Sequence, residues 1–343
     1  MASMTIIDIA RICGVGVTTV SRAINNHPDI SEETKAMIMK VIKENHYVPN
    51  NSARNLKRSA SKTIAVLIKG ITNPFFNRMI QVFEKEIQRK KYSFILQRVD
   101  ENQDEIEVAI ELEKEKRLKG IVFLGGYFAH AKEKLEQLTV PYVLSTIGMT
   151  SEYDPQEYSS VSVDDFKESY KMVDYLCKLG HRKIAIISAP MSDASIGRLR
   201  YEGYKKALED HGLELNENLV RTMKEHIQSY SMENGYVVTK ELLESGEDFT
   251  ALFAISDSLA VGACRAIFEC GKSVPQDYSV AGYDGLDIAY YYNPSITTIQ
   301  QPVEEIAEET IKILFDLINK KITHAHKIFP AELLIRESTT PPS

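Results

Sequence analysis

From Thr63 to the end of the chain, short apolar runs alternate with longer amphipathic segments. The short runs are apolar at consecutive positions, which is typical of parallel strands buried on both faces. The longer segments repeat apolar residues at helical spacing. A repeated order of strand and helix predicts a doubly wound α/β fold. The predicted strands are Ile64–Ile68, Phe94–Leu96, Ile121–Leu124, Tyr142–Leu144, Ile184–Ile187, Leu252–Ile255 and Ser279–Gly282. The predicted helices are Phe76–Lys90, Glu105–Glu115, Lys167–Leu179, Leu199–His211, Met232–Leu243, Leu259–Cys270 and Val303–Asn319.

The first 62 residues have a different pattern. Apolar residues recur from Ile6 to Cys13 at the i, i+3, i+4, i+7 spacing of one buried helix face, and Gly14 ends that segment. A second short helix is predicted for residues 17–25, and a third begins after Ser31, whose hydroxyl is a preferred N-cap. Three short helices in this arrangement predict a helix-turn-helix domain, which places its second helix in the major groove of DNA.

Charge is distributed unevenly along the chain, whose formal net charge is −7. Residues 1–62 hold nine Lys or Arg against five Asp or Glu, a balance of +4, so the remainder carries −11. Phosphate groups attract the first segment and repel the rest. The distribution therefore favours a nucleic-acid contact that is confined to the N-terminal helices.

The composition argues against several other classes of protein. No apolar run approaches the roughly 18 residues of a membrane span, and the N-terminus lacks the apolar segment of a secretory signal. The cysteines form neither a C-x-x-C pair nor a zinc-like cluster with histidines, so we expect no metal and no cofactor. We interpret them as buried thiols in a reducing cytoplasm. They are Cys13, Cys177, Cys264 and Cys270.

Four short motifs carry a specific resemblance to a known family. They are Thr5-Ile6-Ile7-Asp8-Ile9-Ala10, Gly14-Val15, Thr19-Val20-Ser21-Arg22-Ala23-Ile24-Asn25 and Tyr47-Val48-Pro49-Asn50. Together they resemble the lactose/galactose repressor (LacI/GalR) family, and the resemblance covers essentially the whole chain. One departure is Gly16, which stands where the family usually has a serine cap.

The resemblance implies three parts. Residues 1–49 would form the helix-turn-helix domain, residues 50–62 a hinge helix and linker, and residues 63–343 an effector-binding and dimerisation domain. That last part would have the two-lobed fold of periplasmic binding proteins, with three crossovers between the lobes. The first lobe would comprise residues 63–162 with 293–325, and the second residues 163–292 with 326–343.

The second helix of the N-terminal domain presents side chains suited to DNA. Val17, Thr18 and Arg22 are expected to reach base edges, because a guanidinium fork matches guanine and a methyl group can contact thymine. Other polar residues of the domain are expected to contact phosphates, which position the domain without reading sequence. These are Thr5, Ser21, Asn25 and Tyr47.

Residues 50–58 are polar and basic, and so short a segment is marginal as an isolated helix. One interpretation is a flexible linker. The other is a hinge helix that orders on DNA and inserts Leu56 between base steps of the minor groove. The hinge interpretation assigns DNA contacts to Asn50, Ala53, Arg54, Leu56 and Lys57, with Arg58 also facing phosphate.

The resemblance also implies an effector-binding cleft between the two lobes. Arg198 would be the family's effector-binding arginine, whose fork suits sugar hydroxyls or a carboxylate, although it is otherwise a surface arginine at a helix start. Asp257 is either a ligand for the effector or a plain helix N-cap. The remaining implied contacts are Asp164 and Asp284 after predicted strands, Tyr230 as an aromatic platform, and Asn73, Phe76 and Gln301 from the other lobe.

These features predict a homodimeric transcriptional repressor that a sugar or sugar-derived effector releases from a pseudo-palindromic operator. A corepressor that tightens DNA binding is an alternative. A sugar-binding transport protein shares the two-lobed fold but has no DNA-binding domain. Carboxylate pairs in a cleft are also compatible with hydrolysis, but no nucleophile with an adjacent base is evident, so we expect no enzyme.

Overall fold

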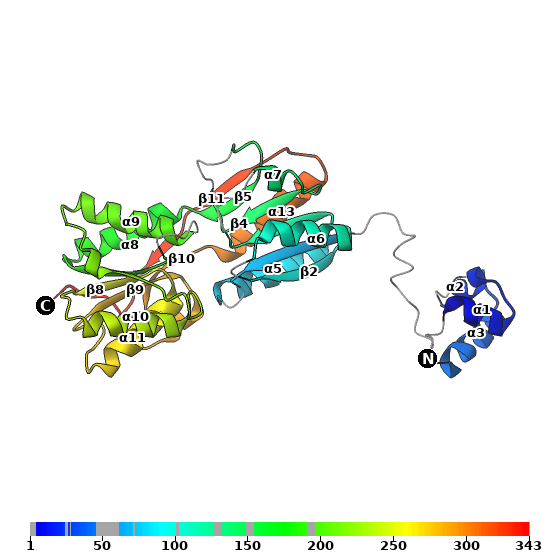
Figure 1. Cartoon of the computed structure of the whole chain (residues 1–343), viewed down its shortest axis with the longest axis horizontal. Helices are drawn as coiled ribbons and strands as arrows, with labels where there is room; N and C mark the ends of the chain where they lie inside the picture. Colours follow the sequence, from blue (N-terminus) through cyan, green and yellow to red (C-terminus); the bar gives the residue numbers. More distant parts are fainter. Residues whose placement is uncertain are drawn as a thin grey trace. The chain divides into compact units, whose positions relative to one another are not determined.

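The structure is a computed structural model, and it describes residues 5–24, 27, 29–45, 62–70, 73–100, 103–126, 132–148, 154–190 and 196–342. The chain divides into two units, residues 1–61 and residues 62–343. We call the first unit the head and the second the body, and each is described by itself (Figure 1).

The head is a small bundle of three helices, as predicted. Thr5 caps the first helix in a capping box: its hydroxyl accepts a hydrogen bond from the backbone of Asp8, whose carboxylate accepts one from the backbone of Thr5. Gly14 ends that helix with φ of +62°, a conformation that favours glycine. The helices are α1 (Ile6–Cys13), α2 (Val17–Ile24) and α3 (Glu32–Glu44), and the core consists of Ile9, Ala10, Val20, Ala23 and Ile38.

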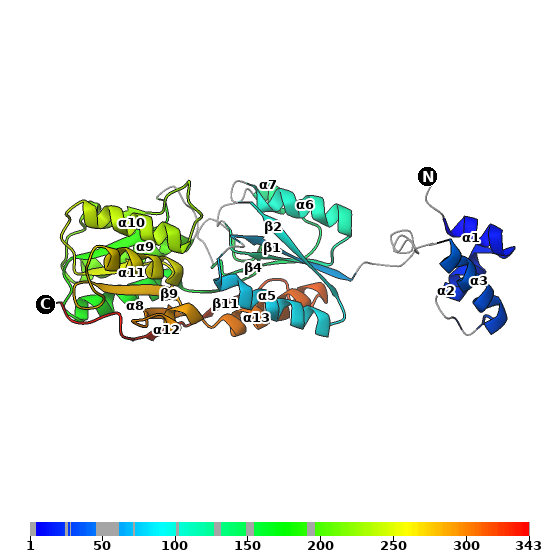
Figure 2. The ribbon, with the colours of Figure 1, turned by 90° about the horizontal axis from the view of Figure 1, so that it is seen from below.

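The first lobe of the body is built on a six-stranded parallel sheet of order β11-β5-β4-β3-β1-β2. Helices α5 and α13 cover one face of this sheet, and α6 covers the other (Figure 2). Its strands are β1 (Thr63–Lys69), β2 (Ser93–Val99), β3 (Gly120–Leu124), β4 (Tyr142–Ser145), β5 (Ser160–Val163) and β11 (His326–Phe329). Its helices are α5 (Phe75–Arg89), α6 (Glu105–Lys116), α7 (Lys132–Leu135) and α13 (Val303–Ile318).

The second lobe repeats the same plan, with strand order β12-β10-β9-β8-β6-β7. Its strands are parallel except β12, which runs antiparallel to β10. Helices α8 and α9 lie on one face and α10 and α11 on the other (Figure 1). The strands are β6 (Ile184–Ser188), β7 (Val220–Thr222), β8 (Ala251–Ala254), β9 (Ser279–Asp284), β10 (Thr297–Gln300) and β12 (Glu332–Leu334). The helices are α8 (Asp165–Lys178), α9 (Ile196–Asp210), α10 (Met232–Glu244), α11 (Asp257–Glu269), α12 (Asp287–Tyr291) and the 3-10 helix η1 (Glu217–Leu219).

The predicted lobe boundaries need two corrections. The first crossover lies between β5 and α8, beside the predicted end of the first segment. The second lies at residues 301–302, after β10, rather than near residue 293, because β10 pairs with β9 in the second lobe. The third lies at residues 330–331, after β11, because β11 pairs with β5 in the first lobe. Residues 293–300 therefore belong to the second lobe and residues 326–329 to the first.

Two of the four cysteines are not buried as predicted. Cys270 is exposed at the end of α11 and Cys13 is half-buried, whereas Cys177 and Cys264 are buried as predicted.

Within the described ranges, no helix is long and apolar enough to cross a membrane.

Candidate functional site

Helix α2 separates its buried face from the face predicted to contact DNA. Val20 and Ala23 are buried in the head core, and Val17, Thr18 and Arg22 are exposed on the other side. Ser21 is half-buried, and Thr5 is exposed but its hydroxyl is engaged with Asp8 at 2.6 Å as the cap of α1. Eight predicted DNA contacts lie outside the described residues: Asn25, Tyr47, Asn50, Ala53, Arg54, Leu56, Lys57 and Arg58.

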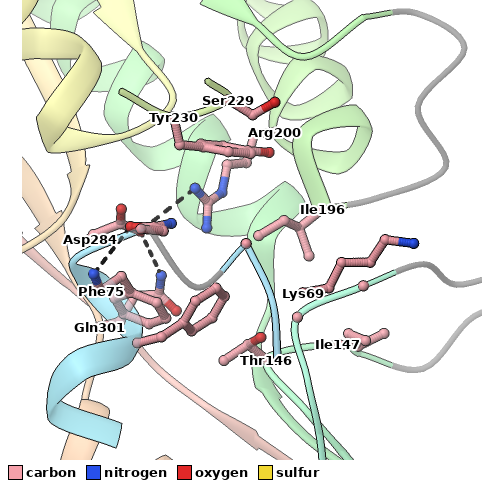
Figure 3. Close-up of a pocket in the computed structure, with 15 residues that line it drawn as sticks. Lys69, Phe75, Thr146, Ile147, Ile196, Arg200, Ser229, Tyr230, Asp284 and Gln301 are labelled. Carbon is pink, nitrogen blue, oxygen red and sulfur yellow. Dashed lines mark hydrogen bonds and ion pairs between the residues drawn. The ribbon is translucent and has the colours of Figure 1, made fainter. Parts of the chain in front are cut away.

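The body contains a pocket at the carboxyl ends of both sheets, where doubly wound folds bind ligands. It holds about 660 Å³ of empty space, a volume that includes the solvent at its open mouth. Its walls come from both lobes (Figure 3). The first lobe contributes Lys69, Gly70, Asn73, Phe75, Phe76, Gly125, Gly126, Thr146 and Ile147, and the second Ile196, Arg200, Ser229, Tyr230 and Asp284, with Gln301 at the second crossover.

Arg200 is the central charged group of the second lobe's wall. Its side chain is 2% exposed and donates to Asp165 Oδ1 at 2.8 Å and to the carbonyl oxygen of Ile255 at 2.6 Å. A guanidinium nitrogen lies 3.6 Å from Asp284 Oδ1, and the guanidinium carbon lies 3.7 Å from the centre of the Tyr283 ring. Burial alone would lower the pKa of Arg200, but the carboxylate of Asp165 more than offsets this and keeps it charged.

Asp284 presents an acceptor to the pocket. Gln301 donates its side-chain amide to Asp284 Oδ1 at 3.0 Å, whereas Oδ2 is buried and has no hydrogen-bond partner among the described residues. Burial raises the pKa of Asp284 to about 8 despite the nearby Arg200. The backbone of Asp284 has φ of +114°, an unfavourable conformation for a residue with a side chain. Strain and an unpartnered acceptor in one residue are typical of a ligand-binding position.

Thr146 is the counterpart of Asp284 on the first lobe. It follows β4, and its buried hydroxyl also has no hydrogen-bond partner among the described residues. Its φ of +68° is rare for a β-branched residue. Tyr230 on the opposite wall has φ of +54°. Three residues that line the pocket thus have backbone conformations that cost free energy.

Apolar rings form the rest of the lining. Phe75 and Phe76 at the start of α5 meet edge to face with ring centroids 5.6 Å apart. Gly125 lies against Phe76, since a Cβ at Gly125 would come 3.0 Å from that ring and 2.8 Å from the carbonyl oxygen of Lys69. Aromatic faces beside a few polar atoms are the usual lining of a site for carbohydrates or other small organic ligands.

Lys69, at the end of β1, is the second cation of the pocket. Its ammonium donates to Glu105 Oε2 at 3.1 Å and to the carbonyl oxygen of Gln103 at 2.8 Å. The side chains of Lys69 and Glu105 are 9% and 5% exposed, so this is a buried ion pair. A Cβ at Gly126 would lie 2.6 Å from Glu105 Oε1, which shows how closely the strand ends surround that carboxylate.

The pocket contains five of the eight predicted effector contacts: Asn73, Phe76, Tyr230, Asp284 and Gln301. Arg198 is a correction, because its side chain is exposed on α9 whereas Arg200 faces the pocket. Residues two apart on a helix point about 200° apart, so both arginines cannot line one cleft.

Asp164 and Asp257 lie outside the lining as well. Asp164 caps α8 by accepting from the backbone N–H of Lys167 at 3.0 Å. Asp257 is fully buried and accepts from the hydroxyl of Thr298 at 2.6 Å and from the N–H of Leu286 at 2.7 Å. It is not an N-cap either, since Ser256 caps α11. Asp257 instead connects α11 to β10 and to the segment before α12.

Sequence reasoning missed Arg200, Lys69 and Thr146. A signal existed for Arg200, which shares the helical phase of Gly197 and Tyr204 on the buried face of α9. No comparable signal existed for Lys69, because its partner Glu105 is distant in sequence. Among the described residues, no group of three or more His, Cys, Asp or Glu side chains could hold a metal ion.

The chain is similar to known regulatory proteins over its full length. A profile described as "Bacterial regulatory proteins, lacI family" matches residues 5–50, and one described as "Periplasmic binding protein-like domain" matches residues 173–339. The HTH-type transcriptional regulator MalR of Clostridium butyricum is 40% identical over 98% of this chain and 99% of its own length. The HTH-type transcriptional repressor PurR of Pasteurella multocida is 30% identical over 97% of this chain and 98% of its own. These relatives are regulators rather than enzymes.

Solved structures give the same picture. The transcriptional regulator CelR in complex with cellobiose superposes with a TM-score of 0.71 at 28% identity, covering 98% of this chain and 99% of that one. A LacI family transcriptional regulator from Enterococcus faecium with bound ribose gives a TM-score of 0.70 at 30% identity, covering 82% of this chain and all of that one.

Proposed function

We propose that this chain is a repressor that a carbohydrate releases from its operator. The chain belongs to the LacI family of bacterial regulatory proteins and is therefore a ligand-responsive, DNA-binding transcriptional regulator. The carbohydrate binds in the pocket between the two lobes of the body. The head binds DNA in the bacterial cytoplasm, and the protein has no enzymatic role.

The observation that supports a carbohydrate most directly is a pair of buried polar atoms, one on each side of the pocket. Asp284 Oδ2 and Thr146 Oγ1 have no hydrogen-bond partner among the described residues. A buried polar atom without a partner costs free energy that a ligand hydroxyl would recover. The rings of Phe75, Phe76 and Tyr230 offer apolar surface for the C–H groups of a sugar. The sugar-bound relatives CelR and the Enterococcus regulator are consistent with this ligand class.

A ligand that contacts both walls favours the arrangement of the lobes in which both sets of contacts form. Two of the three crossovers, at residues 301–302 and 330–331, are hydrogen-bonded to the second lobe. Gln301 donates to Asp284, and the backbone N–H of Ala331 donates to Glu168 Oε1 at 3.2 Å. A change in the arrangement of the lobes would therefore alter both hydrogen bonds at the same time. Effector binding then shifts the population of molecules that can hold DNA.

On DNA we propose a homodimer, whose two heads read the halves of a pseudo-palindromic operator. Val17, Thr18 and Arg22 on α2 would face bases, and Thr5, Ser21, Asn25 and Tyr47 phosphates. Asn50, Ala53, Arg54, Leu56 and Lys57 would form the hinge contact in the minor groove.

The test combines ligand binding with DNA binding. An operator duplex selected from a random pool by the full-length protein is used in gel shifts with and without glucose, maltose, cellobiose and ribose, and the same sugars are titrated by calorimetry. We expect at least one sugar to bind and to release the duplex. Asp284→Asn should weaken the binding of that sugar by about 10-fold or more, because it replaces an acceptor oxygen with an amide donor, whereas Asp287→Asn, at an exposed residue three positions away, should not. A sugar that tightens the DNA complex would identify a corepressor instead, and no binding by any sugar would overturn the proposed ligand class.

A further inference from the structure

We infer that the pocket takes an uncharged carbohydrate and excludes sugar phosphates and sugar acids, because buried carboxylates already neutralise both cations that line it. This inference rests on the proposed function and names the chemical class of the effector.

The charge of the first cation, Arg200, is already balanced by buried carboxylates. Its guanidinium is engaged by Asp165 at 2.8 Å, by the carbonyl oxygen of Ile255 at 2.6 Å and by Asp284 at 3.6 Å. Arg200, Asp165 and Asp284 are each at most 3% exposed, so water screens this cluster poorly. Two carboxylates against one guanidinium leave no net positive charge on this wall, whether Asp284 is ionised or neutral.

The second cation, Lys69, is neutralised on the opposite wall. Glu105 Oε2 lies 3.1 Å from its ammonium, and the carbonyl oxygen of Gln103 accepts from it at 2.8 Å. In Figure 3 the ammonium of Lys69 points away from Asp284 and Arg200. A phosphate that recruited Lys69 would have to compete with Glu105 for the same donors while approaching its carboxylate.

Lys69 and Arg200 are the only cations among the described residues that line the pocket. Segments 71–72, 101–102, 127–131, 149–153 and 191–195 lie outside the described residues, and they contain no Lys or Arg. Their charged residues are Glu101, Glu152 and Asp193, with His130 as the one histidine. Lys132, which follows one of these segments, is the single basic residue of the body whose side chain is not described.

These charges set the preference of the pocket. A phosphate carries nearly two negative charges at neutral pH, and burying it without cationic partners costs far more than burying hydroxyl groups. The hydroxyls of a neutral sugar need only acceptors and donors, which Asp284 and Thr146 supply. Since like charges brought together cost enough to change affinity by about 100-fold or more, we expect a preference of at least that size for the neutral sugar over its phosphate.

The experiment compares matched pairs of ligands on the full-length protein by calorimetry: glucose with glucose 6-phosphate, cellobiose with cellobiose 6′-phosphate, maltose with maltose 6′-phosphate, and glucose with glucuronate. Binding of one or more neutral sugars with at least about 100-fold weaker binding of the anionic partner supports the inference. Equal or tighter binding of an anionic partner overturns the inference and leaves the carbohydrate proposal intact. Failure of every sugar and every phosphate overturns the proposed function itself.

Glu105→Gln tests the mechanism of exclusion. This variant removes the carboxylate that pairs with the Lys69 ammonium. We therefore expect the ratio of the affinity for a neutral sugar to the affinity for its phosphate to fall by about 10-fold or more. The matched control is Glu111→Gln, at an exposed residue of the same helix, which should leave this ratio of affinities as in the unmodified protein. Thermal melting verifies that both variants fold. If Glu105→Gln is folded and binds the neutral sugar but the ratio of affinities is unchanged, Glu105 is not the residue that excludes anions. If it does not fold, the ligand pairs on the unmodified protein still decide the inference.

Discussion

At the scale of single residues, the pocket is defined by side chains held in unfavourable backbone conformations. Thr146, Tyr230 and Asp284 all have positive φ values and all line the pocket. The surrounding fold must hold these conformations, since each costs on the order of 1–3 kcal/mol. Sequence patterns predicted Tyr230 and Asp284 through a family motif, but strain is a property of the folded backbone and left no trace by which Thr146 could be found.

The correction from Arg198 to Arg200 leads to a clear prediction. Arg200→Met should leave Asp165 and Asp284 buried without their cation, at a cost of about 3–5 kcal/mol in the free energy of unfolding, and should abolish effector binding. Arg198→Ala, on the exposed side of the same helix, should change stability by no more than about 0.5 kcal/mol. Urea unfolding and sugar calorimetry measure both quantities. The assignment fails if Arg198→Ala is the variant that loses the effector.

Asp257 predicts a dependence of stability on pH. Burial raises its pKa in the folded body from 3.8 to about 7, despite hydrogen bonds from Thr298 and Leu286. Because the folded pKa lies above the unfolded one, the stabilisation from this group is complete below about pH 4 and is lost as pH rises through about 7. Asp257→Asn removes that titration. The melting temperature of the variant minus that of the unmodified protein should therefore increase between pH 5 and pH 8. The increase should be about 2–4 °C for each kcal/mol that the unmodified protein loses in its free energy of unfolding.

Titrating groups remote from Asp257 act equally in both proteins and cancel in this comparison, whereas the charge of Asp257 also helps to raise the pKa of Asp284. Asp284 loses stabilisation over a higher pH range, through about 8. The pKa of the buried His181 is lowered by burial, so its contribution is lost as pH falls below 6.5. A difference that stays flat with pH would show that Asp257 is ionised throughout.

At the scale of elements, sequence patterns found the apolar strands and most helices but missed the strands at the crossovers. β5 and β10 contain Ser160, Ser162, Thr297 and Thr298, all buried, instead of a continuous apolar run. Three of these hydroxyls have partners distant in sequence: that of Ser160 pairs with His326, that of Thr297 with Thr339, and that of Thr298 donates to Asp257. The hydroxyl of Ser162 has no partner among the described residues. Hydrophobicity cannot reveal a polar strand of this kind, because its burial depends on tertiary hydrogen bonds.

Helices α10 and α11 approach each other through glycine. A Cβ at Gly262 would lie 1.9 Å from the carbonyl oxygen of Met232, and one at Gly235 would lie 2.2 Å from that of Leu259. Gly262→Ala should therefore force the helices apart and destabilise the body by about 1–3 kcal/mol or more. Arg265→Ala, on the exposed face of α11, should cost about 0.5 kcal/mol or less. Chemical unfolding of the full chain distinguishes them, and equal stability of the two variants would contradict the close packing.

For the recognition helix the prediction concerns specificity. Arg22 is exposed on α2, and its guanidinium suits a bidentate contact with guanine. Arg22→Ala should weaken binding to the selected operator by about 10–100-fold and relax the preference at one base pair of each half-site. Arg11→Ala, at an exposed residue of α1 outside the predicted contacts, should leave the preference at every base pair unchanged. Titrations against the operator and single-base variants test this, and a uniform loss for Arg22→Ala would assign it to phosphate.

At the scale of the whole molecule, charge and ligand binding assign different tasks to the two units. The positive charge lies in the first 62 residues and the body is acidic, so DNA contact belongs to the head. The body holds the pocket. Regulation therefore requires that binding in one unit change the free energy of binding in the other.

That requirement is reciprocal and can be measured from both sides. If the effector weakens operator binding by some factor, operator must weaken effector binding by the same factor, since both describe one coupling free energy. We expect a factor of about 5–150. Calorimetry of the sugar with the protein alone and with the protein saturated by its operator gives one value, and gel shifts with and without sugar give the other. At a fixed, subsaturating sugar concentration, Asp284→Asn should reduce the release of DNA, because the variant binds less sugar. Release of DNA by the sugar without any change of sugar affinity on operator would mean that the sugar acts outside this pocket or through a different species.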